Sequence, residues 1–127
     1  MANLKLQRVR FSVEADNRLR MLKARSGLDN NIICRLGLCL SLEEAGDPRS
    51  DSSGQSQREP ISRYTLLGEY DPLFVALLNA RHPSVVDDDE ALERLFVEHL
   101  HRGIALLANR LKGPVSLADL SQSCRVS

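Results

Sequence analysis

The chain is 127 residues long, and 43% of its residues are hydrophobic, which is enough for one domain with a single core. It has no uninterrupted apolar run near the roughly 20 residues that a membrane-spanning helix needs, so we expect no membrane partner. Aromatic residues make up only 4%, and Leu and Ala are abundant after residue 13, which favours helix over sheet. We predict an all-α protein, with residues 1–127 forming a compact single-domain fold of four to five helices.

The net charge of zero hides an uneven distribution of charge along the chain. Residues 1–36 contain eight Lys or Arg residues and three Asp or Glu residues, a net charge of +5, which leaves −5 for residues 37–127. Such asymmetry can place a basic face on a neutral protein, and that face would attract a polyanion such as DNA. Solvated helices also carry Lys and Arg without any ligand, so charge alone leaves both interpretations open.

The three cysteines favour free thiols in a reducing cytoplasm, because their number is odd and no signal peptide is visible. Cys34 and Cys39 lie five residues apart on a predicted helix, which turns them about 140° away from each other. We therefore expect no redox or metal pair, and we interpret both as small buried apolar side chains. The third cysteine, Cys124, falls in the C-terminal tail.

Residues 4–11 are extended in character, and we predict a short strand or an ordered N-terminal arm there. Ser12 is a good N-cap for a helix over residues 13–26, and Gly27 is typical of the position just beyond a helix. Its inward stripe comprises Ala15, Leu19, Leu22 and Ser26.

The outer sides of this first helix carry the best basic patch in the sequence. We name four residues as candidate DNA contacts: Arg18, Arg20, Lys23 and Arg25. Few aromatic residues lie among them, so stacking on single-stranded bases is not expected. Contacts from Lys and Arg to backbone phosphates are the natural alternative, and these tolerate any sequence and weaken with salt.

The next helix begins near Asp29 to Asn31, runs to about Glu44, and is apolar on nearly every side. A helix that is apolar all round is usually buried, so we predict that this is the central helix of the core. Its branched aliphatic residues are Ile32, Ile33, Leu36, Leu38, Leu40 and Leu42.

Arg35 interrupts this apolar helix, and burying an unpaired charge would cost several kcal/mol. One interpretation is a structural ion pair with Glu69 or with another carboxylate. The other is that Arg35 points through a gap toward a surface or a subunit interface.

Residues 45–60 are rich in Gly, Pro, Ser and charge and have no apolar periodicity, which predicts a flexible loop that buries nothing. Strongly structured flanks favour an insertion within one domain, although a linker between domains is an alternative.

Two further helices are predicted in the second half. Asp71 and Pro72 start the first, which runs to about Arg81, is nearly all apolar, and should be buried against the central helix. Asp87 to Asp89 open the second, which runs to about Leu111 and carries Glu90–Arg94 and Glu98–Arg102 as i,i+4 ion pairs. Its inward stripe is Leu92, Leu95, Phe96, Leu100, Gly103, Leu107 and Leu111. After a break at residues 112–114, Ser116 would cap a short last helix beginning at Leu117.

The sequence shows no pattern that points to catalysis. His99 and His101 lie about 200° apart on a helix and cannot bind one metal from one face. A phosphate-binding glycine loop, a nucleophile elbow and a convincing pair of carboxylates are all missing. We therefore expect no catalytic residue, no metal site and no cofactor.

Three sequence blocks are distinctive in combination: LKARSGL-DNN-IICRLGLCLSLEE, RYTLLGEYD and HLHRGIALLANRLKGPVSLADL. Over most of the chain, except residues 45–60 and the first few, this pattern resembles the DndE family of bacterial DNA sulfur modification (phosphorothioation) proteins. The resemblance implies a mainly helical homotetramer that binds double-stranded DNA and prefers nicked DNA. It also implies work beside other Dnd proteins, which replace a non-bridging phosphate oxygen of DNA by sulfur.

In that family, lysines on the helical surface are held to contact DNA, and Lys23 in the LKAR motif matches this pattern. Arg18, Arg20 and Arg25 are added from the basic patch. Because the chain has only three lysines, arginine would replace lysine at some contacts.

The leading hypothesis is therefore a non-catalytic DNA-binding subunit of the phosphorothioation machinery. One alternative is an enzyme of the same system, either a nickase or a thiol-based sulfur carrier. Another is a ribbon-helix-helix regulator, in which strands from two chains would pair and Arg8 and Arg10 would face the major groove. The last alternative is an assembly scaffold that has no affinity for DNA.

Overall fold

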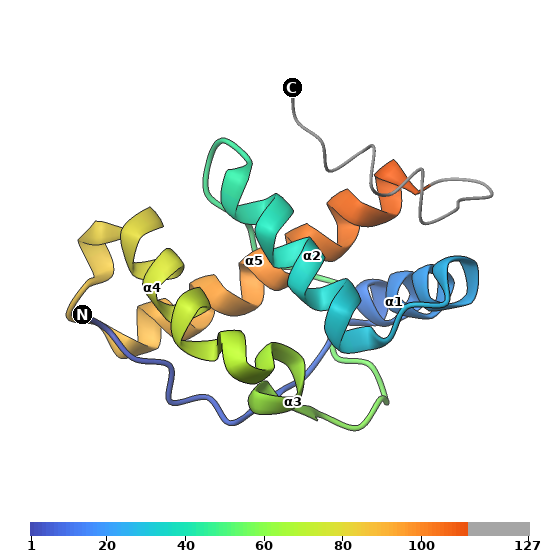
Figure 1. Cartoon of the computed structure of the whole chain (residues 1–127), viewed down its shortest axis with the longest axis horizontal. Helices are drawn as coiled ribbons and strands as arrows, with labels where there is room; N and C mark the ends of the chain where they lie inside the picture. The colour runs from blue at the N-terminus through green and yellow to red at the C-terminus, as the bar shows by residue number, and fades with distance from the viewer. Residues whose placement is uncertain (112–127) are drawn as a thin grey trace.

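The computed structural model describes residues 1–111 and shows a mainly helical protein with one short strand pair, as the all-α prediction requires (Figure 1). The predicted helix at Leu117 and Cys124 lie outside these residues. In the described part, no helix has the length and apolarity needed to cross a membrane. The elements are β1 (Arg8–Val9), α1 (Val13–Ser26), α2 (Asn30–Glu43), β2 (Ile61–Ser62), α3 (Arg63–Leu67), α4 (Asp71–Arg81) and α5 (Asp89–Arg110), with 3-10 turns at Gly68–Tyr70 and Pro83–Val85.

Helix α1 has the predicted bounds and caps. The Ser12 hydroxyl accepts the backbone N–H of Ala15, which satisfies one of the free donors at the helix start. Gly27 adopts φ 74°, and its N–H donates to the Lys23 carbonyl, the left-handed ending that favours glycine. Ala15, Leu19 and Leu22 are buried and Ser26 is half-buried, so three of the four predicted inward residues are confirmed.

Helices α2 and α5 cross at the centre of the molecule, where two glycines bring their backbones into contact (Figure 1). A Cβ atom on Gly103 would lie 2.0 Å from the Gly37 carbonyl oxygen, and one on Gly37 would lie 2.9 Å from the Gly103 carbonyl carbon. Both side chains must therefore be absent for the helices to approach this closely. All seven residues of the predicted α5 stripe are buried around this crossing.

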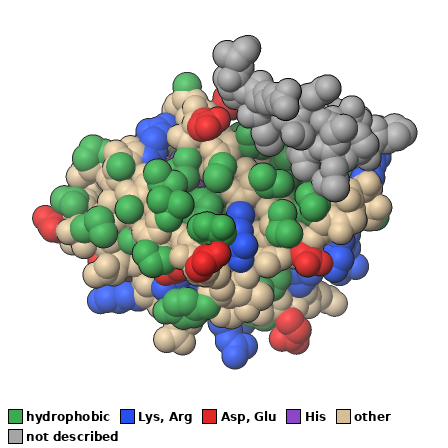
Figure 2. Space-filling view, viewed as in Figure 1, with side chains coloured by type: hydrophobic (Ala, Val, Ile, Leu, Met, Phe, Trp, Pro, Cys, Tyr) green, Lys and Arg blue, Asp and Glu red, His purple; other side chains and the backbone are tan. Residues whose placement is uncertain are grey.

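The prediction that α2 is the central helix of the core is confirmed, since it packs on α5 at Gly37, but neither α2 nor α4 is buried on every side in this chain alone. Helix α2 buries Ile33 and Leu38, but Ile32 is 38% exposed, and its other branched aliphatic residues are half-buried. Helix α4 buries Phe74 and Leu78 and exposes further apolar residues, namely Leu73, Ala76 and Leu77. Figure 2 shows hydrophobic side chains gathered on the face that carries both helices. Each helix thus has a core side and an apolar outer side.

The short helix α3 was missed by the sequence analysis, and its first residue ties the N-terminal arm in place. Arg63 is 5% exposed, donates from Nη1 to the carbonyl oxygens of Leu4 and Leu6, and forms an ion pair with Asp71 at 2.8 Å. At the start of the arm, the Asn79 side chain exchanges two 2.9 Å hydrogen bonds with the backbone of Ala2. The predicted arm is therefore ordered, and only Arg8–Val9 pairs as a strand, antiparallel to Ile61–Ser62.

Residues 45–60 run back across the N-terminal end of α1. The backbone N–H of Val13 donates to the Gly54 carbonyl, and the N–H of Ser56 donates to the Phe11 carbonyl, both at 2.9 Å. The expectation that this segment buries nothing is wrong, because Pro48 is buried. Its predicted flexibility remains a prediction.

Three predicted contacts of charged residues are replaced by others. Arg35 has no carboxylate partner within residues 1–111; its Nε donates to the Leu66 carbonyl at 2.7 Å, and its guanidinium lies 5.5 Å from the centre of the Tyr70 ring. It therefore joins α2 to α3. Arg94 pairs with Glu98 at 3.8 Å instead of with Glu90, and this leaves Arg102 for other partners.

The glycine contact makes a direct prediction for stability. Gly103→Ala should lower the free energy of unfolding by about 2–3 kcal/mol or more, because the new methyl group meets backbone that cannot rotate away. Equilibrium urea unfolding at one fixed protein concentration measures this. Gly54→Ala is the matched control: that site has open space and φ 83°, so only about 1 kcal/mol of backbone strain is expected. Equal losses in the two variants would contradict close packing at Gly103.

Candidate functional site

The four candidate DNA contacts lie on two flanks of α1 instead of forming one patch. With about 100° between successive helical residues, Arg18 and Arg25 lie about 20° apart, and Arg20 and Lys23 about 60° apart. The two pairs are on roughly opposite sides of the helix. Between them, the outward ridge carries Asn17 and Ala24, both exposed.

The four basic side chains differ in how strongly they are already bonded to other residues of the chain. Arg18 pairs with Glu14 at 3.5 Å, and both side chains are substantially exposed, so the pair is weak. Arg25 donates from Nη1 to the Leu111 carbonyl at 3.2 Å. Lys23 is exposed, and no residue of the described part forms an ion pair with it. Lys23 is therefore the most available cation of the four.

Arg20 shares its carboxylate with an arginine that the sequence analysis did not consider. Asp16 is 5% exposed and receives Arg20 at 3.3 Å and Arg58 at 2.5 Å. Burial alone would raise the pKa of Asp16, but hydrogen bonds from Arg58 and Arg20 outweigh burial and hold this pKa below its ordinary value. Two cations around one buried carboxylate leave a positive charge at this flank.

A shallow groove of about 270 Å³ adjoins the other flank, between α1, residues 49–52 and α5. It brings Arg18, Arg49 and Arg102 together, with the carboxylates of Glu14 and Asp51 also in its lining. Arg49 is exposed and has no ion-pair partner within residues 1–111. The sequence analysis missed Arg49 because nothing in a Gly-, Pro- and Ser-rich loop indicates where the loop will return to the surface.

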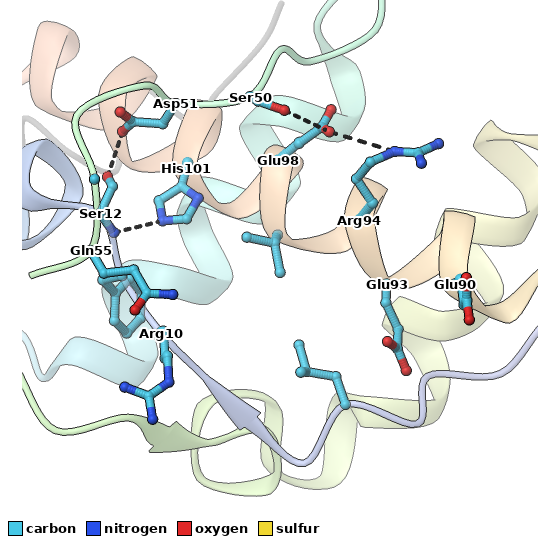
Figure 3. Close-up of a pocket in the computed structure, with 14 residues that line it drawn as sticks. Arg10, Ser12, Ser50, Asp51, Gln55, Glu90, Glu93, Arg94, Glu98 and His101 are labelled. Atoms are coloured by element: carbon cyan, nitrogen blue, oxygen red, sulfur yellow. Dashed lines mark hydrogen bonds and ion pairs between the residues drawn. The ribbon is translucent and has the colours of Figure 1, made fainter.

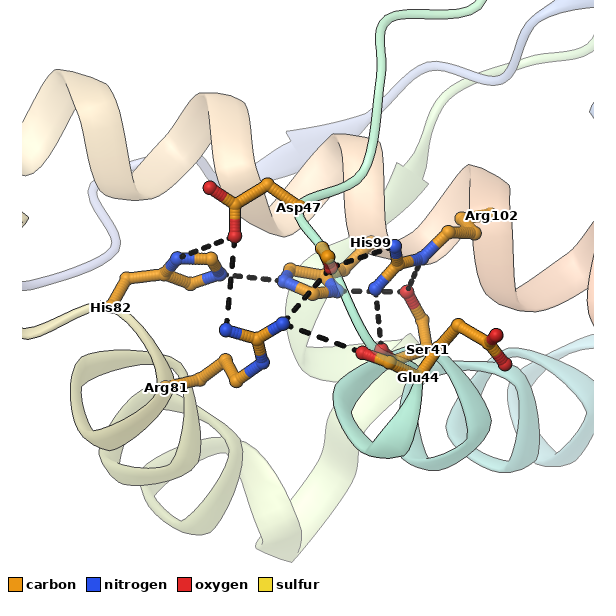
Figure 4. Close-up of polar contacts among 8 residues, drawn as sticks. Ser41, Glu44, Asp47, Arg81, His82, His99 and Arg102 are labelled. Atoms are coloured by element: carbon orange, nitrogen blue, oxygen red, sulfur yellow. Dashed lines mark hydrogen bonds and ion pairs between the residues drawn. The ribbon is translucent and has the colours of Figure 1, made fainter.

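A buried polar network joins α2, α4 and α5 (Figure 4). The Ser41 hydroxyl and Nδ1 of His99 are 2.8 Å apart, and the Nε2 atoms of His99 and His82 are 2.7 Å apart. Asp47 lies 3.7 Å from Nδ1 of His82. Arg102 closes the network by donating from Nε to the Ser41 hydroxyl at 2.8 Å and from Nη2 to the Ser41 carbonyl at 2.7 Å.

Only one direction of proton donation satisfies this network with neutral histidines. The Ser41 hydroxyl donates to Nδ1 of His99, Nε2–H of His99 donates to Nε2 of His82, and Nδ1–H of His82 faces the Asp47 carboxylate. The reverse order would turn a lone pair of His82 toward that carboxylate. Burial, followed by the neighbouring His82 and the guanidinium groups of Arg102 and Arg81, lowers the pKa of His99 to about 4.

The order Ser–His–His–Asp invites comparison with hydrolase sites, but this serine cannot receive a substrate. Ser41 and His99 are both 0% exposed, and the Ser41 hydroxyl already accepts from Arg102. A nucleophile must be reachable by its substrate, and this hydroxyl is not. The hydrogen bonds that join Ser41 to His99 and Arg102 instead hold the C-terminal end of α2 against α5. The residues from 1 to 111 contain no cluster of three or more side chains that could hold a metal ion.

The two helical thiols lie on different sides of α2, as predicted. Cys34 is buried, and burial raises its pKa to about 12, so its thiolate is not formed at neutral pH. Cys39 is exposed, and the expectation that it is buried is wrong.

The histidine network makes a prediction for pH. Unfolded histidine binds a proton below about pH 6.5, whereas folded His99 does so only near pH 4, so stability is lost as the pH falls through this window. Its contribution is at most about 3 kcal/mol. In urea unfolding from pH 7.5 to 4, His99→Leu should be less stable at pH 7.5 and should lose less stability on acidification than the parent protein. Parallel curves would show that His99 does not cause the pH dependence.

Known proteins match both the sequence and the structure. A family model described as the DNA sulphur modification protein DndE matches residues 8–114. The crystal structure of DndE from Escherichia coli B7A, described as involved in DNA phosphorothioation modification, is 27% identical, with a TM-score of 0.68 over 84% of this chain and 99% of that chain. A DndE mutant with lysines at glycine positions is 25% identical, with a TM-score of 0.64 over 82% of this chain and 98% of the other.

No curated protein matches the chain. The family model nevertheless spans most of the 127 residues, and structural neighbours of the same family share the fold over nearly their whole length. The chain therefore belongs to the DndE family of DNA sulphur modification proteins.

Proposed function

We propose that this chain is a non-catalytic, DNA-binding subunit of the bacterial phosphorothioation machinery, working in the cytoplasm with other Dnd proteins. Membership of the DndE family supports its place in that system. The observation that carries DNA binding is α1, an exposed helix with basic side chains on both flanks and with Lys23 free of ion pairs within the described residues.

The two flanks suit a helix that lies against the duplex with its outward ridge facing the DNA. An α-helix is about 10–12 Å across with its side chains, close to the roughly 12 Å width of the major groove. Arg18 and Arg25 would then face one phosphate backbone, and Arg20 and Lys23 the other. The ridge between them offers few groups that could read bases, so binding would be sequence-tolerant.

A preference for nicked DNA belongs to the same proposal. A nick lowers the energy needed to bend a duplex, and a bent duplex could follow α1 toward the groove that contains Arg18 and Arg49. Arg49 would thereby gain a phosphate contact that straight, intact DNA does not bring near it.

The alternatives receive less support from the geometry. Ser41 and Cys34 are buried, which disfavours both as nucleophiles of a nickase or a sulfur carrier. Cys39 is exposed, and unchanged DNA modification in cells that carry Cys39→Ala would exclude it as a sulfur carrier. In a ribbon-helix-helix regulator the first strand pairs with its copy in a second chain, whereas β1 pairs with β2 of its own chain.

A homotetramer is proposed on the apolar outer sides of α2 and α4 (Figure 2). Leu73 and Leu77 are 53% and 40% exposed, and Ile32 and Tyr70 are 38% and 44% exposed. Several large apolar side chains exposed on one face often mark a protein interface, and further copies of the chain could cover them.

Lys23→Ala should weaken binding to a duplex about fivefold, the equivalent of about 1 kcal/mol for one exposed charge contact. It should also reduce the slope of log K against log salt by about one. Gel shifts and fluorescence anisotropy with nicked and intact duplexes over a salt series measure both. Lys5→Ala is the matched control, since Lys5 pairs with Asp89 away from α1. Salt-independent binding, or equal effects of the two variants, would overturn the proposed interface.

The double variant Leu73→Glu/Leu77→Glu should dissociate the tetramer, because four copies would bring eight carboxylates into apolar contacts. Light scattering coupled to size exclusion measures the mass. Val86→Glu places the same charge on a residue that is also exposed, at 39%, but lies outside α2 and α4, and should leave the mass unchanged. A parent protein that is already monomeric would refute the tetramer.

A further inference from the structure

A cavity of about 540 Å³ lies between the N-terminal arm, the loop around residues 50–55 and one face of α5 (Figure 3). Its apolar part is formed by Leu6 and Phe11 from the arm and by Val97 from α5. Phe11 is held by an edge-on contact with the ring of His101, whose Nε2 accepts the backbone N–H of Ser12 at 3.1 Å. The floor is thus an ordered apolar surface, of a size that protein pockets use for ligands.

Carboxylates dominate the charge around this floor. Four acidic residues (Asp51, Glu90, Glu93 and Glu98) and two arginines (Arg10 and Arg94) line the cavity. Glu93 is positioned by the N–H of Lys5 at 3.0 Å, and Glu98 by the Ser50 hydroxyl at 3.2 Å and by the exposed Arg94 side chain at 3.8 Å, a weak pair that an incoming cation could replace. Glu90 is exposed and has no ion-pair partner in the part of the chain that the structure describes. The lining carries two net negative charges and would repel a phosphate backbone.

The spacing of the carboxylates along α5 fits an extended peptide. Glu90 and Glu98 are eight residues apart, which is about 12 Å along the helix axis and about 80° around it, and both line the cavity. In an extended chain, residues i and i+4 are about 13 Å apart, and residues i, i+2 and i+4 point to the same side. A segment with cations at i and i+4 and an apolar residue at i+2 would place its cations at Glu90 and Glu98 and its apolar side chain on the floor between them.

We propose that this cavity binds an extended segment of a partner protein that presents one apolar side chain between two Lys or Arg residues. The charge complementarity of the rim and the apolar floor together select this occupant. The cavity adjoins the groove that contains Arg18 and Arg49, with Ser50, Asp51 and His101 in both linings. The inference rests on the carboxylates and the apolar floor of the cavity, so it does not depend on DNA binding by α1.

The probe is the capped peptide Lys-Thr-Leu-Thr-Lys, titrated into the full-length ¹⁵N-labelled protein. Saturable shifts of backbone signals at the cavity are expected, with a dissociation constant of about 0.1–1 mM for so short a segment. Peptides with Ser in place of Leu, or with Glu in place of both Lys residues, should bind at least fivefold more weakly. Equal binding of the Leu and Ser peptides, or shifts spread over the whole surface, would overturn the proposal.

The double variant Glu90→Gln/Glu98→Gln tests the rim, because glutamine keeps the acceptor for Ser50 but removes the charge. It should lose at least fivefold in peptide affinity, whereas Glu59→Gln/Glu69→Gln, at exposed sites outside the cavity lining, should lose nothing. DNA binding is measured on the same proteins. Unaltered peptide affinity in the rim variant would refute this site while leaving the DNA proposal standing. A parent protein that binds the peptide but not DNA would do the reverse.

Discussion

The contact between Gly37 and Gly103 sets the geometry on which the rest of the molecule depends. The backbones of α2 and α5 touch at this crossing. The neighbouring side chains of α5 therefore point to two different sides of the molecule. Toward α4, His99 and Arg102 reach Ser41 and complete the buried network. On the side facing the N-terminal arm, another face of α5 lines the cavity. One close approach therefore places two unrelated polar sites on a single helix.

Arginine side chains, together with buried apolar residues such as Leu4 and Phe11, position the segments that lack regular structure. Arg63 donates hydrogen bonds to backbone carbonyl oxygens of the N-terminal arm. Arg102 donates to the carbonyl oxygens of Ser41, at the end of α2, and of Gly46. An arginine can do this because its guanidinium offers five donors in a fixed plane, while a backbone carbonyl removed from water must find a donor. The cost of burying each charge is offset by several hydrogen bonds made at once.

The parts that local chemistry determines could be predicted, and those that depend on distant partners could not. The bounds and caps of α1 follow from Ser12 and Gly27, and the α5 stripe follows from its periodicity. Periodicity could not show that Arg102 would turn to Ser41, 61 residues away, instead of to Glu98. It also could not show which apolar residues of α2 would stay exposed in the single chain, such as Ile32 at 38%. The four basic residues of α1 could be named from the sequence, but their division into two flanks follows only from the helix bounds. Arg49 could not be found, because its position depends on the path of the loop that contains it.

The segment from residue 45 to 60 is tethered at intervals, and this divides it into short spans with different tolerance to changes in length. Gly46 is fixed by Arg81 and Arg102, Asp51 by Ser12, and Arg58 by Asp16. Each fixed point shortens the stretch whose ends must be brought together, so the entropy lost in ordering the segment is divided among small closures. Arg49 lies inside the first span. An insertion there would move its guanidinium away from Arg18, whereas an insertion after Arg58 would leave the groove intact.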